Sequence, residues 1–361
     1  MPFFEALASH ARAQEIEILV AAGEPHGEQA LRGDAGLLGP QINLAQRELK
    51  VLGRRVVVRD VSTAIANADL VIMEQARRNL DAYRLLARAP HRRQLVALWG
   101  HGKDYTRQSR QLDRSLQLWL TRRADWFFAY TNGGANAAAA AGSPRERLTV
   151  VQNSIDTNSL RRGVDNVADA EVQSFAAAQG LRGKTALFMG ALDESKRLGF
   201  LFEAVAQAHG RDPDIRLLVG GEGSLHDQVL AAAADLKWLS YLGPLHGHEK
   251  AVAFKASQIL AMPGRVGLVA VDSFAAETPI VTTDWQWHAP EFEYLENGRN
   301  GVITEDSVEA FATGLLETLS DETILGHLRE ECAADSAIYT IETMVDNFLG
   351  GIIGALEAGR K

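Results

Sequence analysis

Short apolar runs, each bounded by turn residues, alternate with longer helix-like patterns along almost the whole of this 361-residue chain. This alternation is typical of βαβ units, in which parallel strands are buried beneath the helices that connect them. The chain is too long for one ordinary hydrophobic core, so we expect two such α/β domains. The expected strands cover residues 16–21, 55–61, 70–73, 95–98, 126–129 and 148–151 in the first half, and 186–189, 217–219, 239–242, 258–262 and 280–282 in the second.

The domain boundary is expected where the strand pattern pauses. Residues 154–182 are polar and contain no strand-like run, so we expect a linker between an N-terminal domain, 1–153, and a C-terminal domain, 183–337. The rest of the chain, 338–361, has apolar positions at helical spacing and is expected to pack back on the N-terminal domain. Other expected helices are 39–52, 76–89 and 106–121.

Composition excludes several classes of protein. With 46% apolar and 23% charged residues, the chain has the balance of a soluble globular protein. It has no window of eighteen apolar residues and no signal-peptide pattern, so we expect a cytoplasmic location. Cys332 is the single cysteine and is expected to be inert. A zinc site built from His246, His248 and Glu249 is a weaker alternative, because no partner cluster accompanies them.

Positive charge is concentrated in residues 76–125. This segment holds twelve Arg and Lys against four Asp, a net charge of +8 in a chain whose net charge is −9. Two interpretations stay open. The charges form solvated helix faces, or they bind an anionic partner, either a phosphate-bearing substrate or the inner face of a membrane, as a peripheral contact. Nucleic acid is disfavoured, because neither a recognised motif nor interleaved aromatic residues accompany the charge.

The most specific segment is 263–281, PGRVGLVAVDSFAAETPIV. Gly267 would let the backbone approach a ligand closely, and the amides of Leu268 and Val269 would point out of a helix N-terminus. Such an end binds phosphate. Asp272 could accept hydrogen bonds from a ribose diol. The alternative interpretation is an ordinary helix with an exposed Asp.

This segment resembles the retaining glycosyltransferases of the GT-B fold, specifically glycosyltransferase family 4. Gly264 and Asp272 occupy the two acidic positions of that family's Glu-x7-Glu pattern, and Gly267 with Leu268 matches its turn. The resemblance covers about residues 95–350. It implies two Rossmann-like domains facing each other across a cleft, with the donor site in the second.

A second match, FMGALDESKRLGFLFEA, resembles the family's strand-end glycine, loop and basic residue. The resemblance implies that Gly190 borders the donor and that Lys196 holds its diphosphate, with Arg197 sharing that role. An ammonium there can neutralise a leaving phosphate as its charge develops. Leu245, in YLGPLHGHE, is expected to offer backbone contacts to the nucleotide base. The alternative for Lys196 and Arg197 is a surface pair at the start of a helix.

In the first domain, His101 follows an expected strand and matches a family histidine that contacts the transferred sugar. A plain loop histidine is the alternative. Family members open with a strand and a Gly-rich loop, whereas this chain begins within the pattern of the first helix, residues 2–12. We therefore expect the N-terminal domain to lack its first strand.

The resemblance implies a metal-independent hexosyltransferase that needs no cofactor beyond its substrate. It would move a sugar from a nucleoside diphosphate sugar to a hydroxyl of a glycan or lipid-linked acceptor, with retention, in cell-surface polysaccharide or glycolipid synthesis. One alternative is a catalytically silent nucleotide-sugar-binding protein, favoured by Gly264 and by Ala191, which stands where the family has an Arg. The other is a GT-B-shaped epimerase, which would need a carboxylate and histidine set that the sequence does not present.

Overall fold

The computed structural model describes residues 2–23, 41–51, 54–87, 93–105 and 111–360. The chain divides into two compact units, one of Met1–Asn153 with Ile341–Lys361 and one of Ser154–Thr340. Within the described ranges, no helix combines the length and the apolar character needed to cross a membrane.

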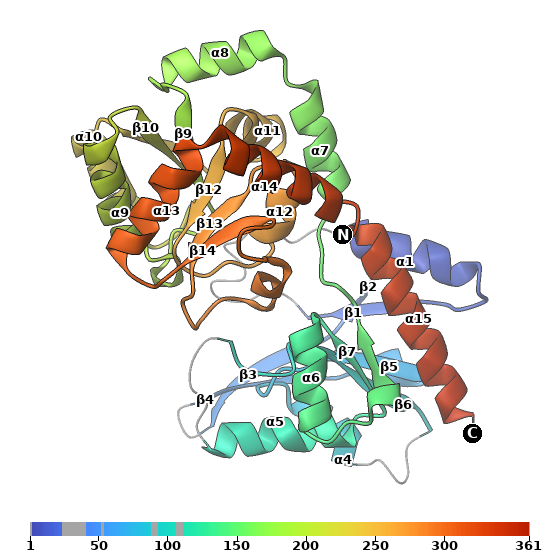
Figure 1. The fold of residues 1–361 in the computed structure, drawn as a ribbon. Helices are drawn as coiled ribbons and strands as arrows, with labels where there is room; N and C mark the ends of the chain where they lie inside the picture. Colours follow the sequence, from blue (N-terminus) through green and yellow to red (C-terminus); the bar gives the residue numbers. More distant parts are fainter. Residues whose placement is uncertain (1, 24–40, 52–53, 88–92, 106–110, 361) are drawn as a thin grey trace. The chain divides into compact units, whose positions relative to one another are not determined.

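The second unit is built on a six-stranded parallel sheet in the order β11-β10-β9-β12-β13-β14 (Figure 1). Its strands are β9 (Lys184–Met189), β10 (Ile215–Gly220), β11 (Leu239–Gly243), β12 (Ile259–Met262), β13 (Ile280–Thr283) and β14 (Gly301–Thr304). The central strands are buried on both faces, which is why they read as continuous apolar runs in the sequence. The strands predicted within this unit are all present, and β14 is an addition.

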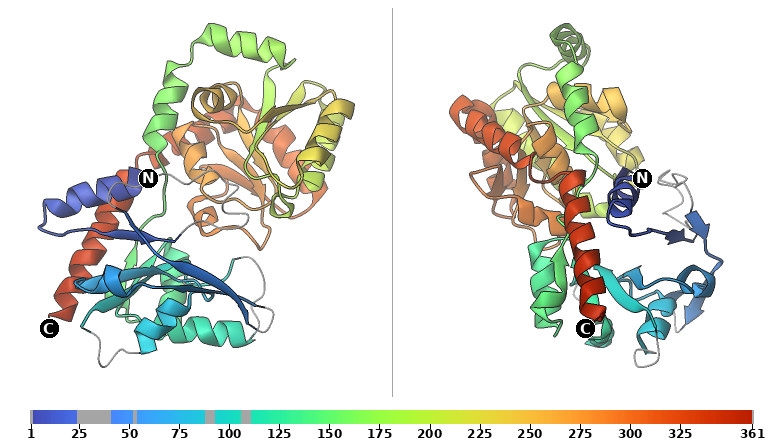
Figure 2. Two further views of the ribbon diagram at one scale, coloured as in Figure 1. Left: turned by 180° about the vertical axis from the view of Figure 1, so that it is seen from behind. Right: turned by 90° about the vertical axis from the view of Figure 1, so that its right-hand side faces the viewer.

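Helices connect and cover these strands, as expected of a Rossmann-like unit (Figure 2). They are α9 (Leu198–Arg211), α10 (His226–Asp235), α11 (Gly247–Lys255), α12 (Val269–Ala275), α13 (Val308–Ser320) and α14 (Glu322–Asp335), with the short 3-10 helices η3 (Glu194–Lys196) and η4 (Pro290–Tyr294). Residues 154–182, expected to be a linker, contain α7 (Thr157–Asn166) and α8 (Asp169–Ala178). Both helices pack against α11, with Val167 buried against Ala251 and Val252.

The first unit contains a four-stranded parallel sheet in the order β5-β6-β7-β8. These strands are β5 (Leu70–Glu74), β6 (Leu95–Gly100), β7 (Trp126–Ala129) and β8 (Leu148–Val150), and the helices around them are α1 (Pro2–Arg12), α3 (Ser62–Ile65), α4 (Leu80–Ala87), α5 (Gln111–Arg123), α6 (Asn132–Ala140) and α15 (Ile341–Gly359), with the 3-10 helix η2 (Arg145–Arg147). Val96 and Leu98 join the core on the side of α4, α5 and α6, whereas Ala97 and Phe128 join the core of α1 and α15. Side chains of successive strand residues thus serve two different cores.

Helices α1 and α15 lie side by side in this unit, in contact with each other (Figure 1). Phe348 of α15 stacks on Phe128 with 4.5 Å between ring centroids. The strand expected over 16–21 is only partly present: β1 (Val20–Ala22) overlaps it at two residues, and residues 16–19 are not in a strand. β1 pairs in parallel with β2 (Gln41–Asn43) in a separate two-stranded sheet.

The prediction of a helix over residues 39–52 is wrong. Residues 41–43 form β2, and β3 (Gln46–Val51) pairs with β4 (Arg54–Arg59) as an antiparallel ladder. Residues 46–51 have fair helix propensity, but the β-branched run of β4 provides a pairing partner that outweighs it. The part of the expected helix 106–121 that falls on residues 106–110 lies outside the described residues, and the rest lies within α5 (Gln111–Arg123).

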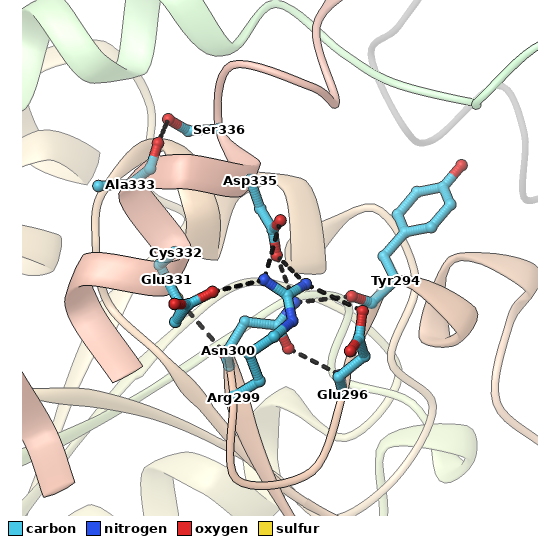
Figure 3. Close-up of polar contacts among 9 residues, drawn as sticks. All are labelled: Tyr294, Glu296, Arg299, Asn300, Glu331, Cys332, Ala333, Asp335 and Ser336. Atoms are coloured by element: carbon cyan, nitrogen blue, oxygen red, sulfur yellow. Dashed lines mark hydrogen bonds and ion pairs between the residues drawn. The ribbon is translucent and has the colours of Figure 1, made fainter. Parts of the chain in front are cut away.

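A charged network anchors the loop before β14 to α14 (Figure 3). The guanidinium of Arg299 donates to Glu331 and Asp335 at 2.7 Å each and to Glu296 at 3.0 Å. Asn300 also donates to Asp335, at 2.5 Å. These carboxylates raise the pKa of Arg299. The side chain of Asp335 is 5% exposed, and the hydrogen bonds from Arg299 and Asn300 compensate for the burial of its charge. We interpret the network as a structural clamp of the second unit.

Candidate functional site

A cavity of about 310 Å³ lies in the second unit, beside segments that follow the carboxyl ends of β9, β11 and β12. In an open parallel sheet, this edge is where ligands bind. The cavity is lined by Met189, Gly190, Lys196, Leu245, Lys250, Gly267, Leu268, Val269 and Asp272. Seven of these nine are residues that the sequence suggested for a donor site, and the structure brings them to one place.

Lys196 supplies a buried positive charge to this cavity. It ends η3, where Asp193 caps the short helix by accepting from the amide of Ser195. The Lys196 ammonium donates to the carbonyl of Arg265 at 2.5 Å. Burial lowers the pKa of Lys196 to about 8, against the opposing charge of Asp193 and with a smaller lowering effect from Arg265. The cation is therefore poorly solvated and is protonated at neutral pH.

A tight turn, Gly267–Val269, also lines the cavity. The amide of Ala270 donates to the carbonyl of Gly267, and the amide of Val271 to that of Leu268, so the amides of Gly267, Leu268 and Val269 precede the helical hydrogen bonds of α12. Amides in this position are suited to bind an anion. Together with Lys196 they make the lining attractive to a phosphate group.

Asp272 and Lys250 form an ion pair in the cavity wall. Their Oδ1 and Nζ atoms are 2.7 Å apart, and the Asp272 side chain is 10% exposed. Burial raises the pKa of Asp272, whereas the charge and hydrogen bond of Lys250 lower it. Lys250 is a site residue that the sequence reasoning missed. It stands one residue beyond the quoted segment YLGPLHGHE, in a polar stretch that resembles any solvated helix start.

Arg197 was expected to share the role of Lys196, but the structure does not bring it to the cavity. Its backbone is left-handed, with φ of 56°. The guanidinium instead donates to Asp306 at 2.5 Å and to the carbonyl of Pro263 at 3.2 Å. It also lies 4.2 Å from the ring centroid of Phe200. The left-handed turn after Lys196 sends consecutive side chains to different partners, so Arg197 secures the loop.

His101 lies in the first unit, directly after β6. It is exposed, and its ring contacts Tyr130 edge to face with 4.4 Å between centroids. His101 is not among the residues that line the cavity of the second unit, and its role in contacting the sugar stays a prediction.

The alternative zinc site is not assembled. His248 contacts Glu171 at 2.6 Å, and over the described part of the chain no three His, Cys, Asp or Glu side chains are grouped to hold a metal. Cys332 is buried, and burial raises the pKa of its thiol to about 12. The thiolate form of Cys332 is therefore disfavoured at neutral pH.

Sequence comparison relates the second unit to known enzymes. Residues 183–321 match the family described as Glycosyl transferases group 1. The phosphatidyl-myo-inositol mannosyltransferase of Mycobacterium tuberculosis is 33% identical over 140 residues, which cover 36% of this chain and 35% of that protein. The D-inositol 3-phosphate glycosyltransferase of Corynebacterium aurimucosum is 28% identical over 148 residues, covering 38% and 35%. The chain spans about a third of the length of these curated relatives.

Solved structures extend the likeness to both units. A glycosyltransferase from Rickettsia africae superposes with a TM-score of 0.72 at 12% identity, over 97% of this chain and 93% of that one. Anabaena Alr3699/HepE in complex with UDP and glucose gives a TM-score of 0.67 at 15% identity, over 97% and 95%. The fold is thus the GT-B fold of two Rossmann-like units. The predicted resemblance to glycosyltransferase family 4 is confirmed, because residues 183–321 match the family described as Glycosyl transferases group 1.

Proposed function

We propose that this protein transfers a hexosyl group from a nucleoside diphosphate sugar to a hydroxyl of a glycan or lipid-linked acceptor, with retention. The observation that carries the proposal is the cavity in which Lys196, the turn Gly267–Val269 and Asp272 meet. A poorly solvated cation and backbone amides that line one cavity are suited to a diphosphate, and a carboxylate in the same lining is suited to a ribose diol. The relatives that act on inositol lipids or inositol phosphate, and the neighbour solved with UDP and glucose, support the same reading.

In this proposal each part of the cavity has one task. Lys196 and the amides of Gly267, Leu268 and Val269 hold the diphosphate and take up the negative charge that develops as the bond from sugar to phosphate breaks. Asp272 accepts hydrogen bonds from the ribose. The backbone near Leu245 borders the base. His101, on the first unit, is proposed to contact the transferred sugar.

Retention is proposed to occur on one face of the sugar. A double displacement needs two carboxyl groups about 5 Å apart. Among the residues that line the described cavity, Asp272 is the one carboxylate, and it is paired with Lys250. We therefore propose that the departing phosphate oxygen accepts the proton of the acceptor hydroxyl, while the new glycosidic bond forms on the same face.

The proposal is tested with a thermal-shift panel of UDP-, GDP- and dTDP-sugars. A ligand that binds the folded state raises the apparent melting temperature by mass action. The best donor is then incubated with candidate acceptors, and the products are analysed by mass spectrometry. We expect stabilisation by one nucleotide series and a glycoside as the product. No stabilisation by any of the three series would refute the donor site.

A catalytically silent nucleotide-sugar-binding protein is the second candidate. The observation that favours it is Gly264, because the position of the family's first acid carries no side chain. A Cβ there would lie 2.5 Å from the Ser195 carbonyl oxygen. Calorimetric binding of a sugar nucleotide, without hydrolysis or transfer in any acceptor screen, would decide for this candidate.

Removal of divalent metal should leave donor binding and transfer unchanged. Lys196 and the turn amides already supply the positive charge that a metal ion would bring to the diphosphate. The measurement is the initial rate with millimolar EDTA present, compared with the rate after Mg²⁺ or Mn²⁺ is added. A large loss of rate with EDTA that metal restores would contradict metal independence.

Replacement of Lys250 with methionine should make nucleotide binding depend on pH. Burial already raises the pKa of Asp272, and Lys250 opposes that rise, so its loss moves the pKa higher still. The carboxylate is then protonated over a wider range, and affinity should be roughly tenfold lower near pH 6 and recover as pH rises. Lys255→Met, on the same helix and outside the cavity, is the matched control. Equal pH profiles for both variants would contradict the proposed role of the pair.

The basic segment 76–125 is proposed to bind an anionic membrane surface beside a lipid-linked acceptor. The exposed residues Arg84, Arg114 and Arg123 of this segment belong to α4 and α5. Co-sedimentation with liposomes should increase when anionic lipid is included, and should fall as salt is raised. Equally weak binding to neutral and anionic liposomes would leave the segment as a solvated surface.

A further inference from the structure

His288 is a buried imidazole that contacts the backbone of Val266, directly before the turn that borders the cavity. It stands between β13 and η4 and is 4% exposed. Its Nε2 is 2.9 Å from the carbonyl oxygen of Thr283, so this nitrogen carries the proton and donates. Its Nδ1 is then unprotonated and accepts a hydrogen bond from the amide of Val266 at 3.1 Å. One neutral tautomer satisfies both hydrogen bonds.

A single peptide group joins His288 to Lys196. The amide of Val266 donates to His288, and the carbonyl of the same peptide group, that of Arg265, accepts from the Lys196 ammonium at 2.5 Å. In a trans peptide the N–H and C=O bonds point in opposite directions. The imidazole and the ammonium therefore hold this peptide group from two sides, and rotating it would break both contacts.

The segment around His288 also fixes the start of the turn. The amide of Ala289 donates to the carbonyl of Val266 at 2.9 Å, so both backbone groups of Val266 bind residues 288–289. A Cβ at Gly267 would lie 3.4 Å from the Cβ of Ala289. Since His288 does not line the cavity, its influence passes through the backbone.

The surroundings keep the imidazole neutral. Burial is the largest of the effects that together lower the pKa of His288 to about 4; the charges of Arg265 and Lys196 also lower it, while the hydrogen bond to Thr283 and the charge of Asp306 raise it. From η4, the ring of Phe292 stacks on the imidazole with 4.0 Å between centroids, and Glu291 lies on the same element. A protonated ring would aim a second N–H at the amide of Val266, so the neutral form is needed for this contact.

We propose that His288 is a positioning residue: through the Arg265–Val266 peptide group it orients the ammonium of Lys196 toward the donor diphosphate. The inference rests on the proposed function for its consequence in binding, but the link between His288 and Lys196 can be measured without any donor. Nothing in the sequence resemblance assigns a role to this histidine.

Two amide substitutions separate the two hydrogen bonds of His288. In His288→Asn the side-chain oxygen can take the place of Nδ1 and still accept from Val266. In His288→Gln a methylene replaces that acceptor, while the longer amide still reaches the carbonyl of Thr283. His327→Asn, at an exposed position of α14, is the control. Folding of each variant is checked by its urea unfolding midpoint.

The first measurement is the pH dependence of amine labelling at Lys196, followed by mass spectrometry. The wild type and His288→Asn should share a midpoint near pH 8. In His288→Gln the midpoint should move to lower pH, because the ammonium loses a well-placed acceptor. The second measurement is calorimetric affinity for UDP, GDP and dTDP. His288→Asn should stay within about threefold of the wild type, and His288→Gln should bind about tenfold more weakly.

The outcomes are distinguishable. A shifted Lys196 midpoint in His288→Gln alone supports the positioning role, even if no diphosphate binds and the proposed function fails. Unchanged labelling and affinity in a folded His288→Gln overturns the role while the proposed function stands. A folded His288→Asn variant whose Lys196 labelling midpoint differs from that of the wild type also overturns the positioning role, because the asparagine oxygen should still accept from the amide of Val266.

Discussion

Replacement of Lys196 with methionine should lower kcat/KM for the sugar nucleotide by about two to three orders of magnitude. Two cations, Lys196 and Lys250, are among the residues that line the described cavity, and Lys250 is paired with the carboxylate of Asp272. Lys196 has no carboxylate partner in that lining. Methionine keeps the volume of the side chain and removes the charge. The comparison uses initial rates at saturating acceptor, with Lys237→Met, at an exposed position, as the control.

The same substitution should cost little stability, which separates a functional effect from a folding defect. Methionine loses the hydrogen bond to Arg265 but also relieves the desolvation of a buried charge, so the free energy of unfolding should change by about 1 kcal/mol or less. The wild type has a further signature. Because the folded-state pKa of Lys196 is about 8, below its usual value of 10.5, the unfolded chain binds more protons between these values, and stability contributed by this group rises with pH across that window. Lys196→Met should lack that rise. A variant that keeps wild-type kcat/KM would contradict the proposed role.

The strands of the second unit could be predicted because strands buried on both faces have short, continuous runs of apolar residues in the sequence. β9 (Lys184–Met189) and β12 (Ile259–Met262) lie within two residues of their expected bounds. β3 (Gln46–Val51) could not be predicted, because it is stabilised by its antiparallel partner. Its sequence alone favours a helix as much as a strand.

The cavity lining could be predicted as far as it follows strand ends along the chain. Gly190 and Gly267 come after β9 and β12, and the topology of a parallel sheet brings such positions together. Lys250 could not be found this way, because its partner Asp272 is 22 residues distant and the pair depends on where the fold places α11 relative to α12. The direction of the Arg197 side chain could not be predicted either, because it depends on the left-handed backbone conformation of Arg197 itself.

Adding a side chain at Gly264 should lower both the stability of the protein and its proposed transfer activity, even when the side chain is the glutamate of the family pattern. A Cβ would lie 2.5 Å from the Ser195 carbonyl oxygen and 2.6 Å from the Lys196 carbonyl carbon, and both are backbone atoms of η3. Gly264→Ala should therefore cost about 1–3 kcal/mol of unfolding free energy. By displacing Lys196 it should also lower kcat/KM by roughly a hundredfold.

The matched control is Gly199→Ala, because a Cβ there meets no atom within 4 Å on α9. This variant should keep its activity and gain up to about 1 kcal/mol of stability, since alanine favours a helix over glycine. Urea unfolding and initial rates on Gly264→Ala, Gly264→Glu and Gly199→Ala make the comparison. Higher activity in Gly264→Glu than in the wild type would show that the loop can move to admit the family's acid. That result would contradict the expectation that close packing of residue 264 against η3 determines the position of Lys196. Loss of activity in both Gly264 variants, with Gly199→Ala unaffected, would mean that this chain has close backbone packing against the backbone of Ser195 and Lys196 where the family pattern has its first acid.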